Sequence, residues 1–202
     1  MANHCWNWVL IEGDNDTLDL LENRMQDYDK FNNLTDWTNH ILGEERYSYP
    51  KDSPYDVVGT RWWDIDWDAM DRDNQSMTVQ GDSAWGPPIH LMELLAKEFD
   101  LKILIEFEES GNDFGGYNKY DKTGILEEHS VSYDQWRYEQ DRAAYLQQFK
   151  YNVKDDYYED LRDVIDSHYK YVSKEDLAEM VTIFVKYILK KEQDERKQKV
   201  QS

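Results

Sequence analysis

The residues best suited to bind a charged ligand are five closely spaced aspartates, Asp64, Asp66, Asp68, Asp71 and Asp73. A string of this kind can form a calcium loop of the EF-hand type. That motif needs glycine at its sixth position and glutamate at its twelfth. Counted from Asp64, those positions hold Ala69 and Gln75. The sequence therefore predicts no EF-hand, and we predict no metal here, although a site of another geometry stays open.

The same aspartates are candidates for binding a protein partner with a basic surface. Residues 61–68 alternate as a strand would, with Trp63, Ile65 and Trp67 on one face and the aspartates on the other. Carboxylates two residues apart on a strand lie about 6.5 to 7 Å apart, close to the phosphate spacing along one nucleic-acid strand. Mimicry of nucleic acid is one hypothesis, and a solvated face that only confers solubility is the other.

No other group of residues favours catalysis. The five histidines share no zinc-type spacing with one another or with Cys5, and His4 and Cys5 would point to opposite faces of a strand. Glu108 and Glu109 diverge for the same reason. The sequence contains no dinucleotide, P-loop or nucleophile-elbow motif. We therefore predict that the protein is not an enzyme and has neither catalytic residues nor a cofactor.

Charge distribution restricts the class of partner. The formal net charge is −20, and residues 1–132 hold 10 Lys and Arg against 28 Asp and Glu, whereas residues 133–202 hold 13 against 15. Such a surface repels nucleic acid and anionic membranes and attracts basic proteins. We therefore expect no direct binding of nucleic acid or membranes.

Cysteine content and the start of the sequence indicate the compartment. Cys5 is the single cysteine, so no intramolecular disulfide can form. The first residues lack the basic leader of a signal peptide, and no apolar run approaches the roughly 20 residues of a membrane helix. We expect a soluble cytoplasmic protein.

The elements that would position these residues follow a β-α-β-β-α-β order. Both parities of residues 4–11 are apolar, which predicts a central strand with both faces covered. A helix to about residue 30, strands near 61–68 and 77–80, a helix begun by Pro87 and Pro88, and a strand over 101–107 follow. A hairpin over 114–130 is added. This pattern predicts an α+β fold of the ferredoxin-like split βαβ type.

Residues 133–202 are predicted to form a helical extension. Helices are expected over 134–149, 155–172 and from Ser173, where Ser173 and Asp176 resemble a capping box. Nine of the fifteen tyrosines lie between Tyr133 and Tyr187. Tyrosine is common at interfaces, so these helices either pack on the domain of residues 1–132 or bind a partner, including a second copy of the chain.

Several segments of residues 1–130 together resemble the YubB-like proteins of phages and plasmids. They are Met1-Ala2-Asn3 with Cys5, Asn7 and Gly13, then 59–62, then 83–88 with Trp85, Pro87 and Pro88, and finally 108–116 with Gly111, Phe114 and Gly115. Trp85 and Phe114 are candidates to meet as a hydrophobic plug. The sequence departs from the family pattern at His4 and Trp6 and after residue 132.

The resemblance implies a ferredoxin-like fold and a mobile element inside a bacterium, and it supplies no catalytic residues. Together with the charge, it leads to our functional hypothesis. We expect a phage- or plasmid-encoded acidic protein that inhibits or redirects a host nucleic-acid-binding or defence protein, with nucleic-acid mimicry as one mode. The alternative is a structural or assembly component of a phage that acts through the helical extension.

Overall fold

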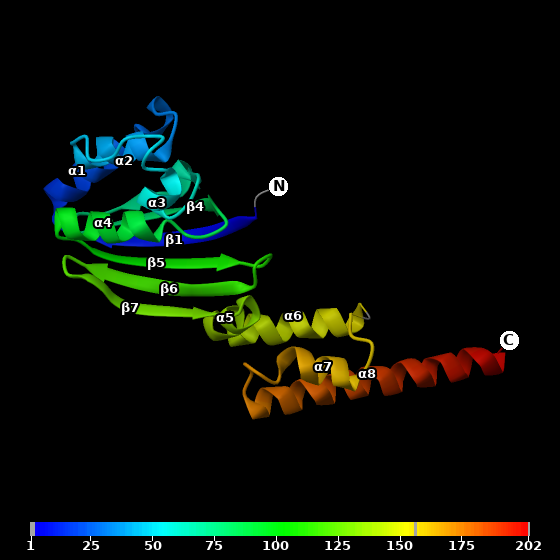
Figure 1. Cartoon of the computed structure of the whole chain (residues 1–202). Coiled ribbons are helices and arrows are strands. Elements are labelled where there is room, and N and C mark those ends of the chain that lie inside the picture. The colour runs from blue at the N-terminus through cyan, green and yellow to red at the C-terminus, as the bar shows by residue number, and fades with distance from the viewer. Residues whose placement is uncertain (1–2, 156, 202) are drawn as a thin grey trace. The chain divides into compact units, whose positions relative to one another are not determined.

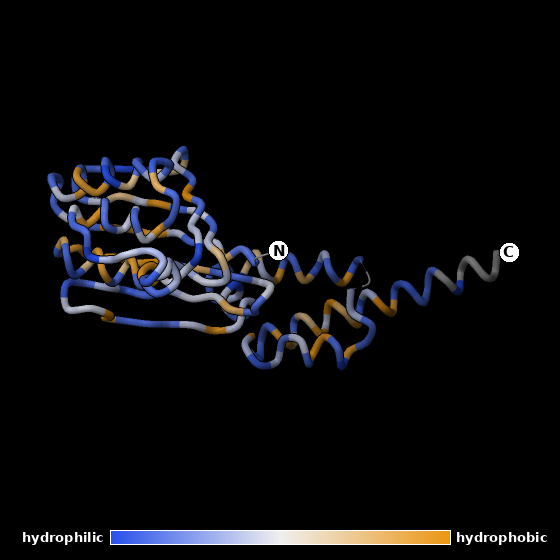
Figure 2. Tube along the Cα trace, turned by 45° about the horizontal axis from the view of Figure 1, so that its top comes forward, coloured by the Kyte–Doolittle hydropathy of each residue, from blue (hydrophilic) through white to orange (hydrophobic). Residues whose placement is uncertain are grey.

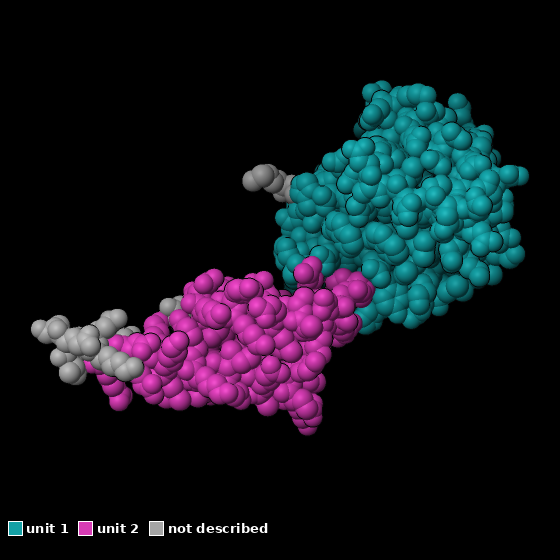
Figure 3. Space-filling model, turned by 180° about the vertical axis from the view of Figure 1, so that it is seen from behind, with its two compact units in different colours: residues 1–133 teal, residues 134–202 magenta. Residues whose placement is uncertain are grey.

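The computed structural model describes the backbone of residues 3–155 and 157–201, and the side chains of these residues except at 195 and 197–201. The chain divides into two compact units, residues 1–133 and 134–202, which are coloured separately in Figure 3. No helix in the described part of the chain is long and apolar enough to cross a bilayer.

The first unit is built on an antiparallel sheet in the order β2-β4-β1-β5-β6-β7, with β3 paired to β4. The strands are β1 (His4–Glu12), β2 (Trp63–Ile65), β3 (Asp71–Arg72), β4 (Ser76–Ala84), β5 (Lys102–Glu109), β6 (Phe114–Asp121) and β7 (Gly124–Val131). The order β2-β4-β1-β5, with helices after β1 and β4, is that of a ferredoxin-like split βαβ fold. The α+β prediction with an added hairpin is confirmed, because β6 and β7 extend the sheet beyond β5.

Helices cover one face of this sheet (Figure 1). They are α1 (Asn15–Met25), α2 (Leu34–Leu42), α3 (Pro54–Val58) and α4 (Ile89–Phe99), with a short 3₁₀ helix η1 (Tyr28–Lys30). Side-chain oxygens of Asp14, Asn33 and Ser53 cap α1, α2 and α3. The core lies between layers, where Val9, Ile105 and their neighbours meet apolar helix residues.

Two local expectations need correction. The strand expected over 61–68 is only β2, because the chain turns at Asp66 into the 3₁₀ helix η2 (Trp67–Ala69) while Trp67 still packs against the core. The prolines precede α4 rather than forming its first turn, since Pro88 is the N-cap. Both differences arise where the chain changes direction, which periodicity alone does not locate.

The described residues of the second unit form four helices, which are α5 (Tyr133–Gln140), α6 (Arg142–Lys154), α7 (Leu161–His168) and α8 (Lys174–Gln201). Hydrophobic and hydrophilic segments alternate along them (Figure 2). The helix expected over 134–149 is divided, because Asp141 takes a non-helical conformation and its carboxylate accepts the Ala144 N–H as an N-cap. The helix expected over 155–172 is shorter for the same reason, with Asp160 as its cap.

A polar network within this unit fixes the start of α8. The Asp176 N–H donates to Ser173 Oγ at 3.1 Å, as the predicted capping box requires. The Asp176 side chain is 1% exposed and accepts hydrogen bonds from Arg142 and from the Tyr138 hydroxyl. Tyr138 Oη in turn accepts the Ser173 N–H at 3.2 Å. One buried carboxylate therefore ties α8 to α5 and α6.

The substitution Asp176→Asn is expected to destabilise the helical unit by about 1 to 2 kcal/mol at neutral pH. Arg142 lowers the pKa of Asp176 from 3.8 to about 2, so this contribution is present above pH 4 and is lost as the pH falls toward 2. Arg142 is largely exposed, and solvent screening keeps the effect modest. Urea unfolding of both proteins, followed by circular dichroism at about pH 6 and about pH 2, measures the difference.

The exposed neighbour Glu175, also in the first turn of α8, provides the control. Glu175→Gln should cost only about 0.3 to 1 kcal/mol, the usual strength of a charge near a helix end. An Asp176→Asn protein as stable as the native chain at pH 6 would contradict the account of the network.

Candidate functional site

The face of the sheet opposite helices α1–α4 presents two tryptophans. On β1, Cys5, Val9 and Ile11 point into the core, while Trp6 and Trp8 alternate onto the other face. Trp6 is 39% exposed. The prediction that both faces of this strand are covered is therefore wrong for Trp6, because the split βαβ topology places helices α1–α4 on one face of the sheet.

Strand pairing surrounds these rings with carboxylates. Asp82 lies opposite Trp6 on one side and Glu108 on the other, and Asp64 lies opposite Asp82. In the next row, Glu106 lies opposite Trp8. Directly opposed residues on neighbouring strands are about 5 Å apart. We name Trp6, Trp8, Asp64, Asp82, Glu106 and Glu108 the acidic sheet face.

A shallow pocket of about 330 Å³ lies within this face. Trp6, Asp64, Asp66 and Asp82 contribute to its lining. Like charges directly across two strands repel each other, so the Asp64 and Asp82 pair disfavours folding. A cationic group seated in the pocket would remove that repulsion, and it would also meet the ring of Trp6.

Glu106 is the carboxylate of this face whose pKa is shifted by burial. Its side chain is half-buried between strands that bear Trp8 and Tyr117 as its direct neighbours. Burial raises the pKa of Glu106 above the usual 4.5. Among the residues that the structure describes, no cation or hydrogen-bond donor engages this carboxylate. A guanidinium or ammonium group from outside would satisfy it.

Replacing Glu106 by glutamine is therefore expected to stabilise the fold while weakening the binding of a basic ligand. Because folding raises the pKa, the folded state prefers the protonated acid, and ionisation lowers the free energy of unfolding as the pH rises above 4.5. Urea unfolding should show Glu106→Gln as the more stable protein at pH 7, with the two proteins converging near pH 3. Lower stability at pH 7 would contradict this account.

The structure separates the five aspartates predicted from the sequence. Asp64 and Asp66 line the pocket, whereas Asp68 lies in η2 and Asp71 on β3. Asp73 is a turn residue, because its carboxylate accepts the N–H groups of Gln75 and Ser76, which lower its pKa. Sequence reasoning missed Trp6, Trp8, Asp82 and Glu106. The signal for Trp6 and Trp8 was the apolar character of both parities in β1, and the signal for Glu106 was its place on the polar face of the alternating strand over residues 101–107.

The residues that carried the family resemblance hold the fold together. The Asn3 carbonyl accepts the Trp85 N–H at 3.1 Å, and a side chain at Gly111 would collide with the Asn3 amide. The buried Glu109 carboxylate accepts N–H groups from Gly111 and Asn112. Phe114 packs against Phe107 with ring centroids 6.0 Å apart. The motifs around Trp85 and Gly111 therefore both contact Asn3, which immediately precedes β1.

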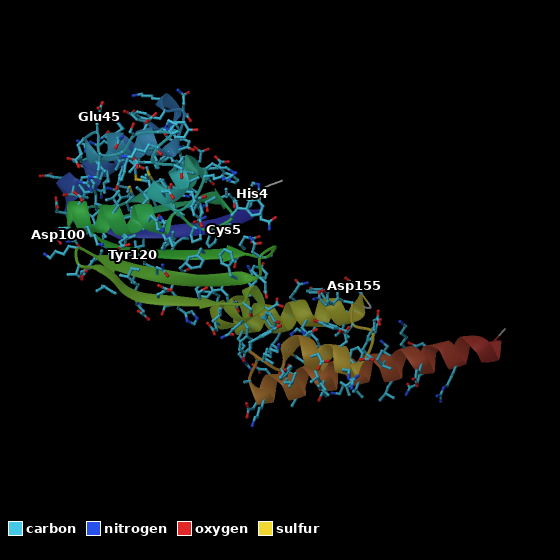
Figure 4. All side chains as sticks on the ribbon, viewed as in Figure 1. His4, Cys5, Glu45, Asp100, Tyr120 and Asp155 are labelled. Carbon is cyan, nitrogen blue, oxygen red and sulfur yellow. The ribbon has the colours of Figure 1, made fainter. Side chains whose placement is uncertain are left out.

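Cys5 has a packing role. It lies beside His4 on β1 (Figure 4), is fully buried, and burial raises the pKa of its thiol to about 12. A thiol in that state is not a nucleophile at neutral pH. Within the described residues, no group of three or more His, Cys, Asp or Glu side chains could hold a metal ion.

Comparison with known proteins gives one family match. Residues 62–150 match the ferredoxin-like domain in Api92-like protein. That segment contains β2 to β7 and most of the first two helices of the second unit. A crystal structure of a protein api92 from Yersinia pseudotuberculosis is similar at 12% identity and a TM-score of 0.43, covering 65% of this chain and 99% of that one. No curated protein matches the chain.

Proposed function

We propose that the protein is an interaction module that binds a basic surface of another protein through the acidic sheet face. The observation that carries this proposal is Glu106, a half-buried carboxylate between Trp8 and Tyr117 that no described residue neutralises. Aromatic rings beside carboxylates are the surroundings that arginine and lysine side chains prefer. The chain's net charge of −20 would increase the rate of encounter with such a partner.

The partner in this proposal is a nucleic-acid-binding or defence protein of a bacterial host, which the chain inhibits or redirects. Glu106 and Glu108 lie two residues apart on β5 and face the same side, at a spacing of about 6.5 to 7 Å. Asp64 and Asp82 add a second pair across neighbouring strands. This grid supports nucleic-acid mimicry. A phage or plasmid origin belongs to the same proposal and rests on the sequence motifs around Trp85 and Gly111.

Capture from bacterial lysate tests the proposal. The tagged full chain is incubated with lysate at about 50 mM and about 500 mM salt, and bound proteins are identified by mass spectrometry. We expect a basic, nucleic-acid-binding protein that is released as the salt rises and that nucleic acid displaces. A partner retained equally at both salts, with no competition from nucleic acid, would contradict the proposal.

A second candidate function is assembly through the helical unit. Leu161 and Ile165 on α7, and Val185 and Leu189 on α8, lie one helical turn apart and are all exposed. Two such apolar pairs could bind another copy of the chain or a virion component. This function predicts self-association that survives high salt, because apolar contacts are not screened. Light scattering of Val185→Glu with Leu189→Glu would then show smaller particles than the native chain.

A further inference from the structure

A second surface of unit 1 forms a groove of about 850 Å³. Residues 32–61 and the turn at Trp85 supply its lining, so it does not share residues with the acidic sheet face. Six of its residues matter for recognition, namely Tyr49, Pro50, Pro54, Tyr55, Arg61 and Trp85. We name these six the aromatic groove.

Trp85 is held in this groove by an unfavourable backbone conformation. Its φ is +69°, a region that bulky residues rarely adopt. Neighbouring contacts maintain it, because the Asn3 carbonyl accepts its N–H and the Ser83 hydroxyl donates to the Gly86 carbonyl at 2.8 Å. The result is an indole ring that is 47% exposed. Strain that keeps a large ring in solvent is typical of a binding residue.

Two tyrosines accompany this ring. Tyr49 is 53% exposed and Tyr55 is 58% exposed. Pro50 and Pro54 lie next to them in the chain and in the groove lining. Three large rings at one surface offer an apolar partner extensive contact area at a small cost in side-chain entropy.

Arg61 distinguishes the groove electrostatically. The other arginines of unit 1 are engaged, since Arg24 donates to the Ile41 carbonyl and Arg46 and Arg72 bind carboxylates. Arg61 is exposed, and no carboxylate or carbonyl of the described residues pairs with it, although the chain has 43 Asp and Glu residues. Its charge is available to a ligand that carries an anionic group.

We propose that the aromatic groove binds an extended, proline-containing peptide segment whose carboxylate pairs with Arg61. Proline-rich segments in the polyproline II conformation dock onto aromatic-lined grooves. The free peptide already has little conformational entropy, so it loses little more on binding. Trp, Tyr and Arg are the residues that most often dominate such interfaces. One arginine can pair with one carboxylate. A nucleoside triphosphate would require more than one cation at its site, particularly in a chain of net charge −20.

The test uses three fluorescein-labelled synthetic peptides and the full chain. The first has a Pro-x-x-Pro core with an adjacent Glu, the second has Lys in place of that Glu, and the third has Ala in place of the prolines. Fluorescence polarisation should show binding of the Glu peptide, with the other two at least about tenfold weaker. If none of the three binds, the proposal is wrong.

Two variants of the chain locate the binding. Arg61→Glu should lose affinity for the Glu peptide by about tenfold or more and prefer the Lys peptide. Trp85→Gly removes the ring while fitting the positive φ, so it should fold normally and lose binding of the Glu peptide. Unchanged binding in both variants would overturn the proposal, as would binding of adenosine triphosphate that depends on Arg61 and Trp85.

A variant of the acidic sheet face separates this proposal from the proposed function. Asp64→Lys with Asp82→Lys should leave peptide binding unchanged, because neither residue lines the aromatic groove. Loss of peptide binding in that double variant would place the peptide on the sheet and contradict the proposal.

Discussion

Reversing two charges on the acidic sheet face, Asp64→Lys with Asp82→Lys, is expected to weaken binding of the basic partner by at least about 100-fold, or about 2.7 kcal/mol. Two attractions become two repulsions, and the groups lie around one pocket. The fold should survive, because one like-charge pair across β2 and β4 replaces another. Calorimetric titration against the captured partner gives the affinity, and urea unfolding gives the stability.

The single variant Asp64→Lys sharpens this expectation. It places opposite charges across β2 and β4, which should stabilise the fold by about 0.2 to 1 kcal/mol. Binding should still fall. A protein that becomes more stable and binds less well would link the native repulsion to function rather than to folding.

A matched control separates the face from the overall charge. Asp16→Lys with Glu45→Lys makes the same change in net charge at exposed positions on the helical layer. This variant should lose only the long-range part of the attraction, roughly a fewfold reduction in association rate at low salt. Equal losses in the two double variants would contradict a defined site on the sheet.

The substitution Gly81→Ala is expected to have the largest effect on stability, about 2 to 4 kcal/mol. A Cβ atom at this position would collide with the Asp64 backbone oxygen, and a backbone atom cannot rotate away. Strands β2 and β4 would separate, and Asp64 would move from its place opposite Asp82. Denaturant unfolding measures the loss, and partner binding should fall with it.

Gly86 provides the comparison. A Cβ atom there would meet nothing within 4 Å. Gly86→Ala should be neutral or stabilising by up to about 1 kcal/mol, because it restricts only the unfolded chain. If Gly81→Ala proved as harmless as Gly86→Ala, this result would contradict the close approach of the β2 backbone to Gly81 on β4.

The sequence was sufficient to predict the β-α-β-β-α-β order and the added hairpin of unit 1, although it did not predict α3 or β3. The alternation of apolar and polar residues on β5 predicts a strand, and the glycines that follow predict the hairpin. The apolar stripe of α4 predicts a helix. Ser173 and Asp176 likewise predict the start of α8. These signals depend on residues near one another in the chain.

The acidic sheet face could not be predicted in the same way. Its members come from β1, β2, β4 and β5, and only strand order and register bring Asp82 and Glu108 to either side of Trp6. A shift of one residue would have moved every side chain to the opposite face. The aspartate string was informative only in part, because the turn at Asp66 ends β2 and separates Asp64 from Asp73.

Oxidative footprinting of the full chain, alone and bound to its captured partner, tests the central claim most directly. We expect Trp6 to become protected from oxidation in the complex, while the exposed Tyr151 and Tyr157 of the helical unit react as in the free chain. Protection confined to the helical unit, with Trp6 as reactive as before, would contradict binding through the acidic sheet face.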